Sequence, residues 1–432
     1  MLIKATISNM FSFENETVLD FSAGREQIHS QYISYVKKYR KKIVPALCLF
    51  GPNGAGKTCF FKSIKLVQSL VLAQTFDDQN IKVEPFLLSS DNNNKSSICL
   101  EFLAENDYIY RYKIQLSPIF IYQESLEKLV VGNYQEIFSR KNGKIHYPET
   151  LTEEKKNVLS FTSENTSKNQ LILNKRNQIL SKYFDDIDVT FKWFGHISFV
   201  TPDTRFIPFS MRQGNYEKLT NLLNEYGFNI EYITGEECSF DIIPSFIKKE
   251  IESNLTPKKG AITIDSTGEF IVTYKEKEKI KSIKLCCWHK NKDGTPVRFN
   301  LQQESDGIRR VIEVSPIFNI LSNGSKERSL IVIDELDRGL HPLLTKHIIR
   351  KFIKNSSKDT RNQLIFTSHD LSIIERETLR QDQIFIVGKN ENHATYIEKL
   401  NDSNIRSDKG LRKYYLEGNL GGLPLIENIE LH

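Results

Sequence analysis

The stretch Phe50-Gly51-Pro52-Asn53-Gly54-Ala55-Gly56-Lys57-Thr58 follows an apolar run over residues 43–50 and precedes a segment whose apolar residues recur at helical spacing. A strand, a glycine-rich turn and a helix form the context in which Gly-x-x-x-x-Gly-Lys-Thr binds phosphate. The glycines let backbone N–H groups point inward, and the start of the helix adds the positive end of its dipole. The sequence therefore predicts a polyphosphate-binding loop here. The alternative, a glycine turn without a ligand, is disfavoured by the flanking strand and helix.

The residue types of this loop predict their roles. We expect Lys57 to reach the β and γ phosphates of a nucleotide, and the hydroxyl of Thr58 to ligate Mg²⁺. Gly54 and Gly56 should bring the loop backbone close to the phosphates. The predicted ligands are accordingly ATP and Mg²⁺.

Composition sets limits on the class of protein. The chain has 432 residues, 39% of them hydrophobic, which is enough for a sizeable core. Its formal net charge of +5 permits contact with nucleic acid without indicating it. Six cysteines show no metal-site spacing and favour reduced thiols. No signal peptide or membrane-spanning run is present in the sequence, so we expect a soluble, cytoplasmic protein without a membrane partner.

The pattern of strands and helices predicts an α/β fold built from both ends of the chain. We expect an ATPase core over 1–75 and 300–432, because strand and helix signals alternate there. Residues 76–150 read as an antiparallel β subdomain with turns at Asn-Asp and Asn-Gly dipeptides. An inserted, mainly helical lobe with β-hairpins is expected over 151–299. No long heptad run is found, so no long coiled coil is predicted.

A basic segment interleaved with tyrosines, Gln31 to Lys42, precedes the core strand. Such a segment can hold a nucleic-acid backbone and stack bases. It can equally be a solvated loop that leads into the core, and the sequence favours this second interpretation.

A buried strand, Leu330 to Ile333, ends in two adjacent carboxylates. We expect Asp334 to hold Mg²⁺, directly or through water, and Glu335 to orient or deprotonate the attacking water. A further acid, Asp337, follows in the same turn.

Two more polar features flank that strand. Upstream, Ser305 and Gly307 open a predicted helix, as an anion cradle or as a plain N-cap. Downstream, His369 ends the strand that begins at Gln363. A lone histidine is usually structural, but this one stands where a sensor of the γ-phosphate would be useful.

Four motifs, Gly-Pro-Asn-Gly-Ala-Gly-Lys-Thr, Glu-Ser-Asp-Gly, Ile-Asp-Glu-Leu-Asp and Thr-Ser-His-Asp, occur in this order. Together they resemble the ATP-binding-cassette class of ATPases, in particular its SMC/RecF-like branch. In that class Lys57 and Thr58 match the Walker A residues, and Asn53 within the loop is typical. The resemblance implies an ABC-type head: a mixed sheet with an antiparallel β subdomain.

The same resemblance assigns the remaining positions. Asp334 and Glu335 match the Walker B pair, Asp337 the D-loop and His369 the switch histidine. Ser305 and Gly307 match the signature, although its first, third and fifth residues differ from the usual Leu-Ser-Gly-Gly-Gln.

The termini extend the resemblance to a bacterial and archaeal ATPase family found near antiphage genes. The stretch Ile7 to Phe13 looks like the "N-F-x-S-F" opening of that family, and Leu411 to Gly418 looks like its ending. Its members include the ATPase component of PARIS-type defence systems and related abortive-infection ATPases.

The resemblance implies a homodimer, or a higher homo-oligomer, in which the signature of one subunit completes the ATP site of another. It implies slow ATP hydrolysis by a sensor or scaffold that controls an effector, a nuclease or toxin, in antiphage defence. The alternative is a RecF-like ATPase that binds DNA and serves repair. A transporter ATPase is a third possibility, which the divergent signature and the large inserted lobe disfavour.

Overall fold

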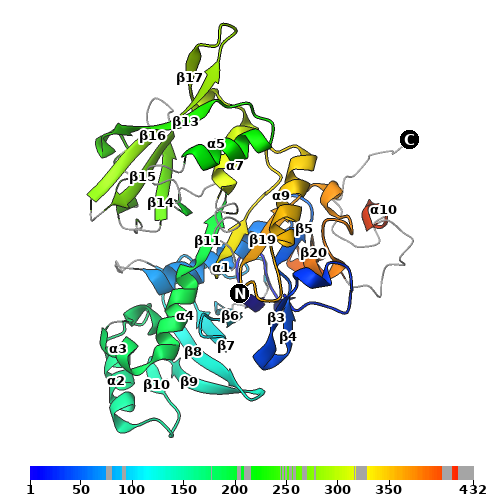
Figure 1. Ribbon diagram of the computed structural model, residues 1–432. Helices are drawn as coiled ribbons and strands as arrows, with labels where there is room; N and C mark the ends of the chain where they lie inside the picture. Colours follow the sequence, from blue (N-terminus) through cyan, green and yellow to red (C-terminus); the bar gives the residue numbers. More distant parts are fainter. Residues whose placement is uncertain are drawn as a thin grey trace. The chain divides into compact units, whose positions relative to one another are not determined.

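The computed structural model describes residues 1–73, 80–89, 94–176, 178–201, 206–208, 216–243, 245, 248, 251–252, 255, 259–264, 270–276, 279–315, 317, 328–400 and 411–416. The chain divides into two compact units. Unit 1 comprises Met1–Ile197, Ser325–Leu330 and Ile353–His432, and unit 2 comprises Ser198–Gly324 and Ile331–Phe352 (Figure 1).

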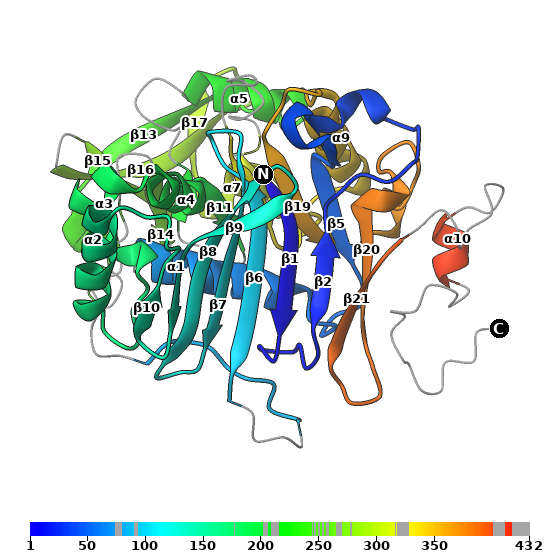
Figure 2. The ribbon, with the colours of Figure 1, turned by 90° about the horizontal axis from the view of Figure 1, so that it is seen from below.

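Unit 1 contains a seven-stranded antiparallel sheet in the order β10-β9-β8-β7-β6-β1-β2 (Figure 2). The strands are β1 Leu2–Ser8, β2 Thr17–Asp20, β6 Ser96–Leu103, β7 Ile109–Leu116, β8 Ile121–Val130, β9 Asn133–Lys141 and β10 Lys144–His146. The predicted Asn-Gly turn joins β9 to β10, with φ of 48° at Asn142 and 81° at Gly143. Positive φ values at both central residues are typical of a type I′ turn, whose twist matches that of two paired antiparallel strands.

The second sheet region of unit 1 has four neighbouring strands in the order β19-β5-β20-β21. They are β5 Ala46–Phe50, β19 Gln363–Ser368, β20 Ile384–Lys389 and β21 Thr395–Lys399. Strand β5 is parallel to β19 and to β20, and all of its residues are buried. A strand with parallel neighbours on both sides is buried on both faces, which explains its continuous apolar sequence.

The buried side chain of Gln363 joins the two sheets of unit 1. Its Oε1 accepts a hydrogen bond from the backbone N–H of Leu2 at 2.8 Å. Its Nε2 donates to the carbonyl oxygens of Leu2 and Val44, at 3.1 and 3.2 Å. One amide therefore satisfies three backbone groups from the first strand and from the chain entering β5.

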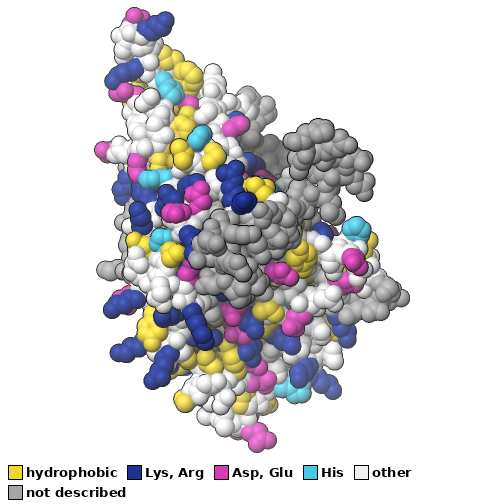
Figure 3. Space-filling view, turned by 90° about the vertical axis from the view of Figure 1, so that its right-hand side faces the viewer, with side chains coloured by type: hydrophobic (Ala, Val, Ile, Leu, Met, Phe, Trp, Pro, Cys, Tyr) yellow, Lys and Arg dark blue, Asp and Glu magenta, His cyan; other side chains and the backbone are white. Residues whose placement is uncertain are grey.

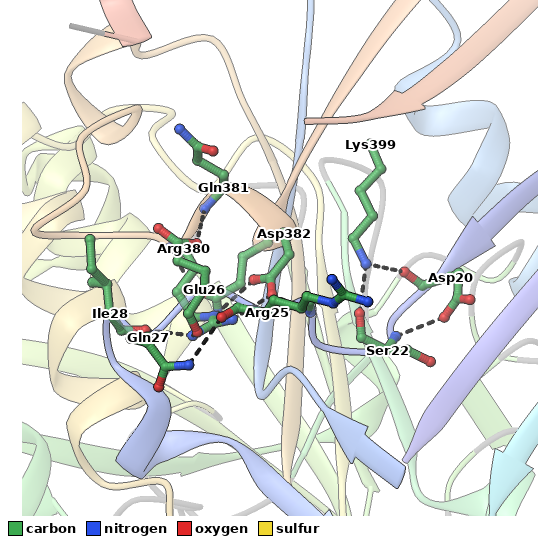
Figure 4. A network of polar contacts seen from close by, with 12 residues as sticks. Asp20, Ser22, Arg25, Glu26, Gln27, Ile28, Arg380, Gln381, Asp382 and Lys399 are labelled. Atoms are coloured by element: carbon green, nitrogen blue, oxygen red, sulfur yellow. Dashed lines mark hydrogen bonds and ion pairs between the residues drawn. The ribbon is translucent and has the colours of Figure 1, made fainter. Parts of the chain in front are cut away.

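A second polar network joins the segment after β2 to the chain around β20 and β21 (Figure 4). The guanidinium of Arg380, 1% exposed, donates to both carboxylate oxygens of Asp382 and to the carbonyls of Glu26 and Ile28. Lys399 donates to the carbonyls of Asp20, the last residue of β2, and of Ser22. These contacts fasten residues far apart in sequence into one unit.

Unit 2 contains an antiparallel sheet in the order β12-β14-β15-β16-β13, with β17 paired to β16. Its strands are β12 Phe206–Pro208, β13 Tyr232–Cys238, β14 Lys259–Ile264, β15 Phe270–Glu276, β16 Lys279–Lys290 and β17 Pro296–Asn300. Strands β11 Ile197–Val200 and β18 Leu330–Ile333 are neighbours in the sheet order, and the first residue of each belongs to unit 1.

The helices of unit 1 are α1 Lys57–Leu72, α2 Glu153–Glu164, α3 Gln178–Tyr183, α4 Asp185–Gly195 and α10 Leu411–Leu416. Among the described residues of unit 2, α5 Tyr216–Glu225, α7 Asp306–Val314 and α9 Pro342–Lys354 have defined bounds, and the last residues of α9 return to unit 1. Short 3-10 helices in unit 1 are η1 Ser30–Tyr32, η2 Lys37–Tyr39, η3 Leu173–Lys175, η7 Leu371–Ile373 and η8 Gln381–Gln383, and in unit 2 η4 Phe240–Ile242 and η5 Leu301–Gln303. Within the described part of the chain, no helix combines the length and the apolar character needed to cross a bilayer.

The predicted fold class is confirmed. The fold is α/β, with the glycine-rich loop between a buried parallel strand and a helix, and with an antiparallel sheet that β6 to β10 form together with β1 and β2.

We predict that Gln363→Leu lowers the free energy of unfolding by about 2–4 kcal/mol, because it leaves three buried backbone groups of Leu2 and Val44 without partners. Urea denaturation followed by circular dichroism measures the loss. Gln135→Leu, at an exposed position of β9, is the matched control and should change stability by no more than about 0.5 kcal/mol. Equal losses in both variants would contradict the assigned role of Gln363.

Candidate nucleotide site

The glycine-rich loop, residues 51–56, passes from β5 into α1 in contact with β20 and β21. A Cβ atom added to Gly51 would lie 2.2 Å from the carbonyl oxygen of Val387. A Cβ atom added to Gly56, whose φ is +106°, would lie 2.1 Å from Oγ1 of Thr395 and 2.7 Å from Oγ of Ser12. No side chain fits at either position, so close packing requires glycine at both, and at Gly56 the positive φ favours glycine as well.

Two hydroxyl groups brace the end of this loop. Oγ1 of Thr395 lies 2.8 Å from Oγ of Ser12 and 2.8 Å from the carbonyl oxygen of Ala55. Because a hydroxyl has one proton and a carbonyl can only accept, Thr395 donates to Ala55 and Ser12 donates to Thr395. The backbone N–H of Thr395 also donates to the carbonyl of Ser12 at 2.7 Å. The relay therefore holds the peptide that precedes Gly56 in one orientation.

Lys57 folds back over the loop. Its side chain is buried, and its ammonium donates to the carbonyl oxygens of Gly51 and Pro52, both at 2.8 Å. Nδ1 of His369 lies 3.4 Å from the same ammonium. Since an ammonium only donates, Nδ1 acts as acceptor and the ring proton sits on Nε2. The structure thus brings the predicted sensor histidine to the predicted phosphate-binding lysine.

The open side of the loop carries the other predicted contacts. Asn53, Gly54 and Thr58 are exposed, and φ at Gly54 is +76°. Thr58 lies in the first turn of α1, where the positive end of the helix dipole favours an anion. These groups form a surface on which a polyphosphate can bind.

The strand with the carboxylates starts in unit 1. Ser329, just before β18, donates its N–H to Oδ1 of Asn362 at 3.0 Å and accepts from the N–H of Gln363 at 2.9 Å. The entry to β18 is therefore fixed beside the entry to β19. Asp334 and Glu335 follow at the far end of this four-residue strand, in unit 2.

Within unit 2, Arg310 of α7 holds the two carboxylate residues by their backbone. Its Nη2 donates to the carbonyl oxygens of Asp334 and Glu335, at 2.8 and 2.5 Å. Asp334 is 2% exposed, and Glu335 has a left-handed φ of +51°, which is costly for a residue with a side chain. Arg310 pairs with Glu313 at 2.8 Å, and burial lowers the pKa of its guanidinium. The arginine thus links the helix after Ser305 to the strained turn at Glu335.

The predicted signature residues pack against the turn after β18. Ser305 is exposed and is the N-cap of α7, accepting a hydrogen bond from the N–H of Ile308 at 3.3 Å. A Cβ atom on Gly307 would lie 3.4 Å from the carbonyl oxygen of Gly339, and one on Gly339 would lie 3.3 Å from Cβ of Asp306. The signature turn and the turn that contains Asp337 therefore form one continuous surface of unit 2.

A pocket of about 700 Å³ opens on that surface. Ser305, Asp306 and Gly307 line one side, and Gly339 and His341 line another. The signature residues are thus accessible from outside the unit and are not enclosed in its core.

The predicted site residues divide between the units. Unit 1 holds Asn53, Gly54, Gly56, Lys57, Thr58 and His369, and unit 2 holds Ser305, Gly307, Asp334, Glu335 and Asp337. Sequence reasoning missed Arg310, Ser12 and Thr395. Of the adjacent arginines 309 and 310, only packing makes the second one buried. Ser12 belongs to the N-terminal motif, for which the sequence indicates no role.

We predict that Thr395→Val weakens nucleotide binding about five-fold, the effect of one lost hydrogen bond of about 1 kcal/mol, because the carbonyl of Ala55 loses its partner. Fluorescence titration with a labelled ATP analogue measures the change. Thr395→Ser keeps the hydroxyl and is expected to bind like the wild type. Unchanged affinity in Thr395→Val would exclude a role of the hydroxyl relay in binding.

Several solved structures are similar to this chain over most of its length. An SMC head domain from Thermotoga maritima has 13% identity and a TM-score of 0.35, covering 93% of this chain and 99% of that one. The recombination mediator protein RecF with ATP has 11% identity and a TM-score of 0.37, covering 92% and 99%. RecF with ATPrS has 10% identity and a TM-score of 0.35, covering 92% and 98%. No curated protein matches.

One protein family matches residues 47–375, and its description is "AAA domain, putative AbiEii toxin, Type IV TA system". The matched range contains the glycine-rich loop, the signature turn, the carboxylates after β18 and His369. The predicted relationship to abortive-infection ATPases is thereby confirmed at the level of the family. The chain belongs to this AAA-domain family of AbiEii-type proteins.

Proposed function

We propose that this protein binds and hydrolyses ATP, dimerises around the nucleotide, and acts as a sensor or scaffold that controls an effector protein in antiphage defence. The observation that carries the proposal is the braced loop between β5 and α1, with Lys57 folded onto it. The accessible signature turn of unit 2 and the family to which the chain belongs support it further.

Polyphosphate binding follows from the groups around Lys57. Its ammonium is held by the carbonyls of Gly51 and Pro52 and lies close to His369. The γ-phosphate of ATP would be a charged acceptor for this ammonium, which is a stronger partner than a neutral carbonyl. The Nε2–H of His369 would then be a donor for the same phosphate. Nucleotide would therefore reorganise contacts that already hold the lysine nearby.

The oxygen ligands suit Mg²⁺. The hydroxyl of Thr58 and the carboxylate of Asp334 are hard donors, which Mg²⁺ prefers. When bound, the ion would neutralise charge on the phosphate oxygens. Asp334 is 2% exposed, and its backbone is fixed by Val200 and Arg310, so its carboxylate would need little ordering on binding.

Hydrolysis would use Glu335 as the group that orients or deprotonates water. Its backbone carbonyl is held by Arg310, which extends from the signature helix α7. A nucleotide that contacts Ser305 and Gly307 of a second copy would thus act on the helix that positions Glu335. Asp337, in the turn that packs against the signature, is placed to take part in the same contact. This coupling would make turnover depend on dimerisation.

Control of an effector is the finer part of the proposal. The family description, which names a putative AbiEii toxin of a type IV TA system, supports a place in a system that includes a toxic activity. The proposal assigns that activity to a partner effector. ATP occupancy of the dimer would then be the signal.

We predict that Lys57→Ala abolishes ATP binding, because the ammonium that holds the phosphates is lost. Glu335→Gln should bind ATP normally, yet turn it over at least about 100-fold more slowly, because it removes the base and keeps the phosphate contacts. Titration with a labelled ATP analogue and phosphate release measure the two properties. Lys62→Ala, an exposed position on the same helix, is the control for Lys57. Wild-type turnover in Glu335→Gln would rule out this assignment.

The same variants test the defence role in cells. A host that carries the protein with its neighbouring genes should resist phage, and Lys57→Ala should abolish resistance while Lys62→Ala retains it. Equal resistance with Lys57→Ala would separate defence from nucleotide binding.

We further predict that Ser305→Tyr prevents ATP-driven dimerisation while each subunit still binds nucleotide, because the bulky ring would block the accessible turn. Light scattering of Glu335→Gln protein with ATP gives the reference dimer. The double variant, which combines Ser305→Tyr with Glu335→Gln, should remain monomeric under the same conditions. Lys346→Ala on α9 serves as a control. An undiminished dimer in the double variant would argue against the signature contact.

A further inference from the structure

A short basic hairpin projects cations from unit 1. Strands β3 Ser34–Val36 and β4 Lys41–Ile43 are antiparallel and are joined by η2. Lys37, Lys38, Arg40 and Lys42 are exposed, whereas the intervening Tyr39 is partly buried. Arg40 ends the turn with a left-handed φ of 52°. The turn therefore directs its basic side chains outward and its tyrosine inward.

The cations of this hairpin are not neutralised by the described part of the protein. Within it, no carboxylate forms an ion pair with Lys37, Lys38, Arg40, Lys41 or Lys42. Acidic residues close to where the tip of the hairpin packs on the seven-stranded sheet pair with other cations. These ion pairs are Asp107–Arg328 at 3.0 Å, Asp186–Lys128 at 2.8 Å and Glu127–Arg111 at 3.3 Å. The hairpin is consequently a local excess of positive charge.

This excess is local, because the whole chain is near charge balance. On the face shown in Figure 3, acidic side chains lie among the basic ones in several places, whereas the basic side chains at the lower left have few acidic neighbours. By contrast, the sequence from Gln27 to Ala73 contains no Asp or Glu, and its basic residues begin with the hairpin. An uninterrupted field of one sign is what attracts a polyanion.

The tip of the hairpin is fastened to the seven-stranded sheet. The hydroxyl of Tyr39 donates to the carbonyl oxygen of Leu129 at 2.9 Å. The ammonium of Lys38 lies 3.0 Å from the centroid of the Tyr108 ring, and that of Lys128 lies 3.9 Å from it. Tyr108 is thus held between two ammonium groups, which keeps the backbone of the tip in place.

The base of the hairpin is fastened as well. Tyr35 donates its N–H to the carbonyl of Lys358 at 2.8 Å, and Oγ of Ser34 donates to the carbonyl of Thr360 at 2.5 Å. Arg361 donates to Oγ of Ser34 at 2.8 Å. With both ends fixed, the exposed cations are presented in a set arrangement, so binding would cost little ordering of the backbone.

We propose that this hairpin binds the phosphate backbone of duplex DNA, through Lys37, Lys38, Arg40, Lys41 and Lys42. The tyrosines do not act as stacking platforms for bases, because Tyr39 is engaged by Leu129 and Tyr108 by two lysines. Contact is therefore with the backbone and independent of sequence. This inference goes beyond the proposed ATPase function and does not rest on it.

Two other phosphate-bearing partners fit the hairpin less well. Binding at a lipid surface uses apolar side chains beside the cations, but no large hydrophobic residue between 27 and 45 is exposed. A small polyphosphate is held in a concave site, whereas these cations stand on a projecting turn. A long, regular polyanion can reach all of them at once.

The test is salt-dependent binding of a fluorescent 30-base-pair DNA, measured by anisotropy without nucleotide. If all five cations contact phosphate, wild-type affinity should fall about 500-fold between 50 and 200 mM salt. The triple variant Lys37→Ala, Arg40→Ala, Lys42→Ala keeps two of the cations, so its affinity should fall only about 12-fold over the same range. It should also bind more weakly than the wild type at 50 mM salt.

The control is a second triple variant, Lys141→Ala, Lys144→Ala, Lys168→Ala, which removes the same charge from exposed positions of unit 1. It should bind like the wild type. Equal losses in both triple variants, or no DNA binding by the wild type at 50 mM salt, would overturn the proposal. So would tighter binding of single-stranded than duplex DNA, or binding of phosphatidylserine vesicles in place of DNA. Thermal melting verifies that both variants are folded.

Discussion

Two close backbone contacts fix the loop on which the proposed chemistry depends. Gly51 lies against the carbonyl of Val387, and Gly56 lies against the hydroxyls of Thr395 and Ser12. At both places any side chain would collide, so close packing holds the loop against β20, β21 and Ser12. The hydroxyl relay then orients the peptide at Ala55. A phosphate-binding loop needs such preorganisation, because its donors are backbone groups that cannot be repositioned individually.

In unit 2 a single buried side chain links the helix that Ser305 caps to the two carboxylate residues. Arg310 extends from the helix that Ser305 caps and holds the carbonyls of Asp334 and Glu335. Since the guanidinium is buried and its fork is rigid, a shift of the helix would move the strained turn at Glu335 directly. The exposed signature turn and the turn after β18 also pack through glycines, at Gly307 and Gly339, without flexible side chains between them. A partner that presses on the signature would therefore be sensed at Glu335.

The chain brings its distant ends together in unit 1. Gln363 joins the first strand to the entry of β5, and Arg380 with Asp382 joins the segment after β2 to β20. The same unit anchors the basic hairpin at both ends. The nucleotide loop and the hairpin thus belong to one stretch without carboxylates, 27–73, and are both braced by residues from the other end of the chain. A polyanion bound at either place would therefore contact unit 1.

By itself, the sequence determined the loop at Gly51 to Lys57, the strand that ends in Asp334 and the antiparallel turns, because these depend on local periodicity and on residues with special backbone angles. It also indicated the family, through motifs in a set order. Tertiary structure decided that Arg310, and not its neighbour Arg309, is buried. It decided as well that Thr395 supplies the hydroxyl beside Gly56. It also decided that Tyr39 faces inward while its basic neighbours face solvent. These outcomes depend on contacts between residues that are 24, 90 and 340 positions apart in the sequence. Local sequence carries no information about which residues will pack against each other over such separations.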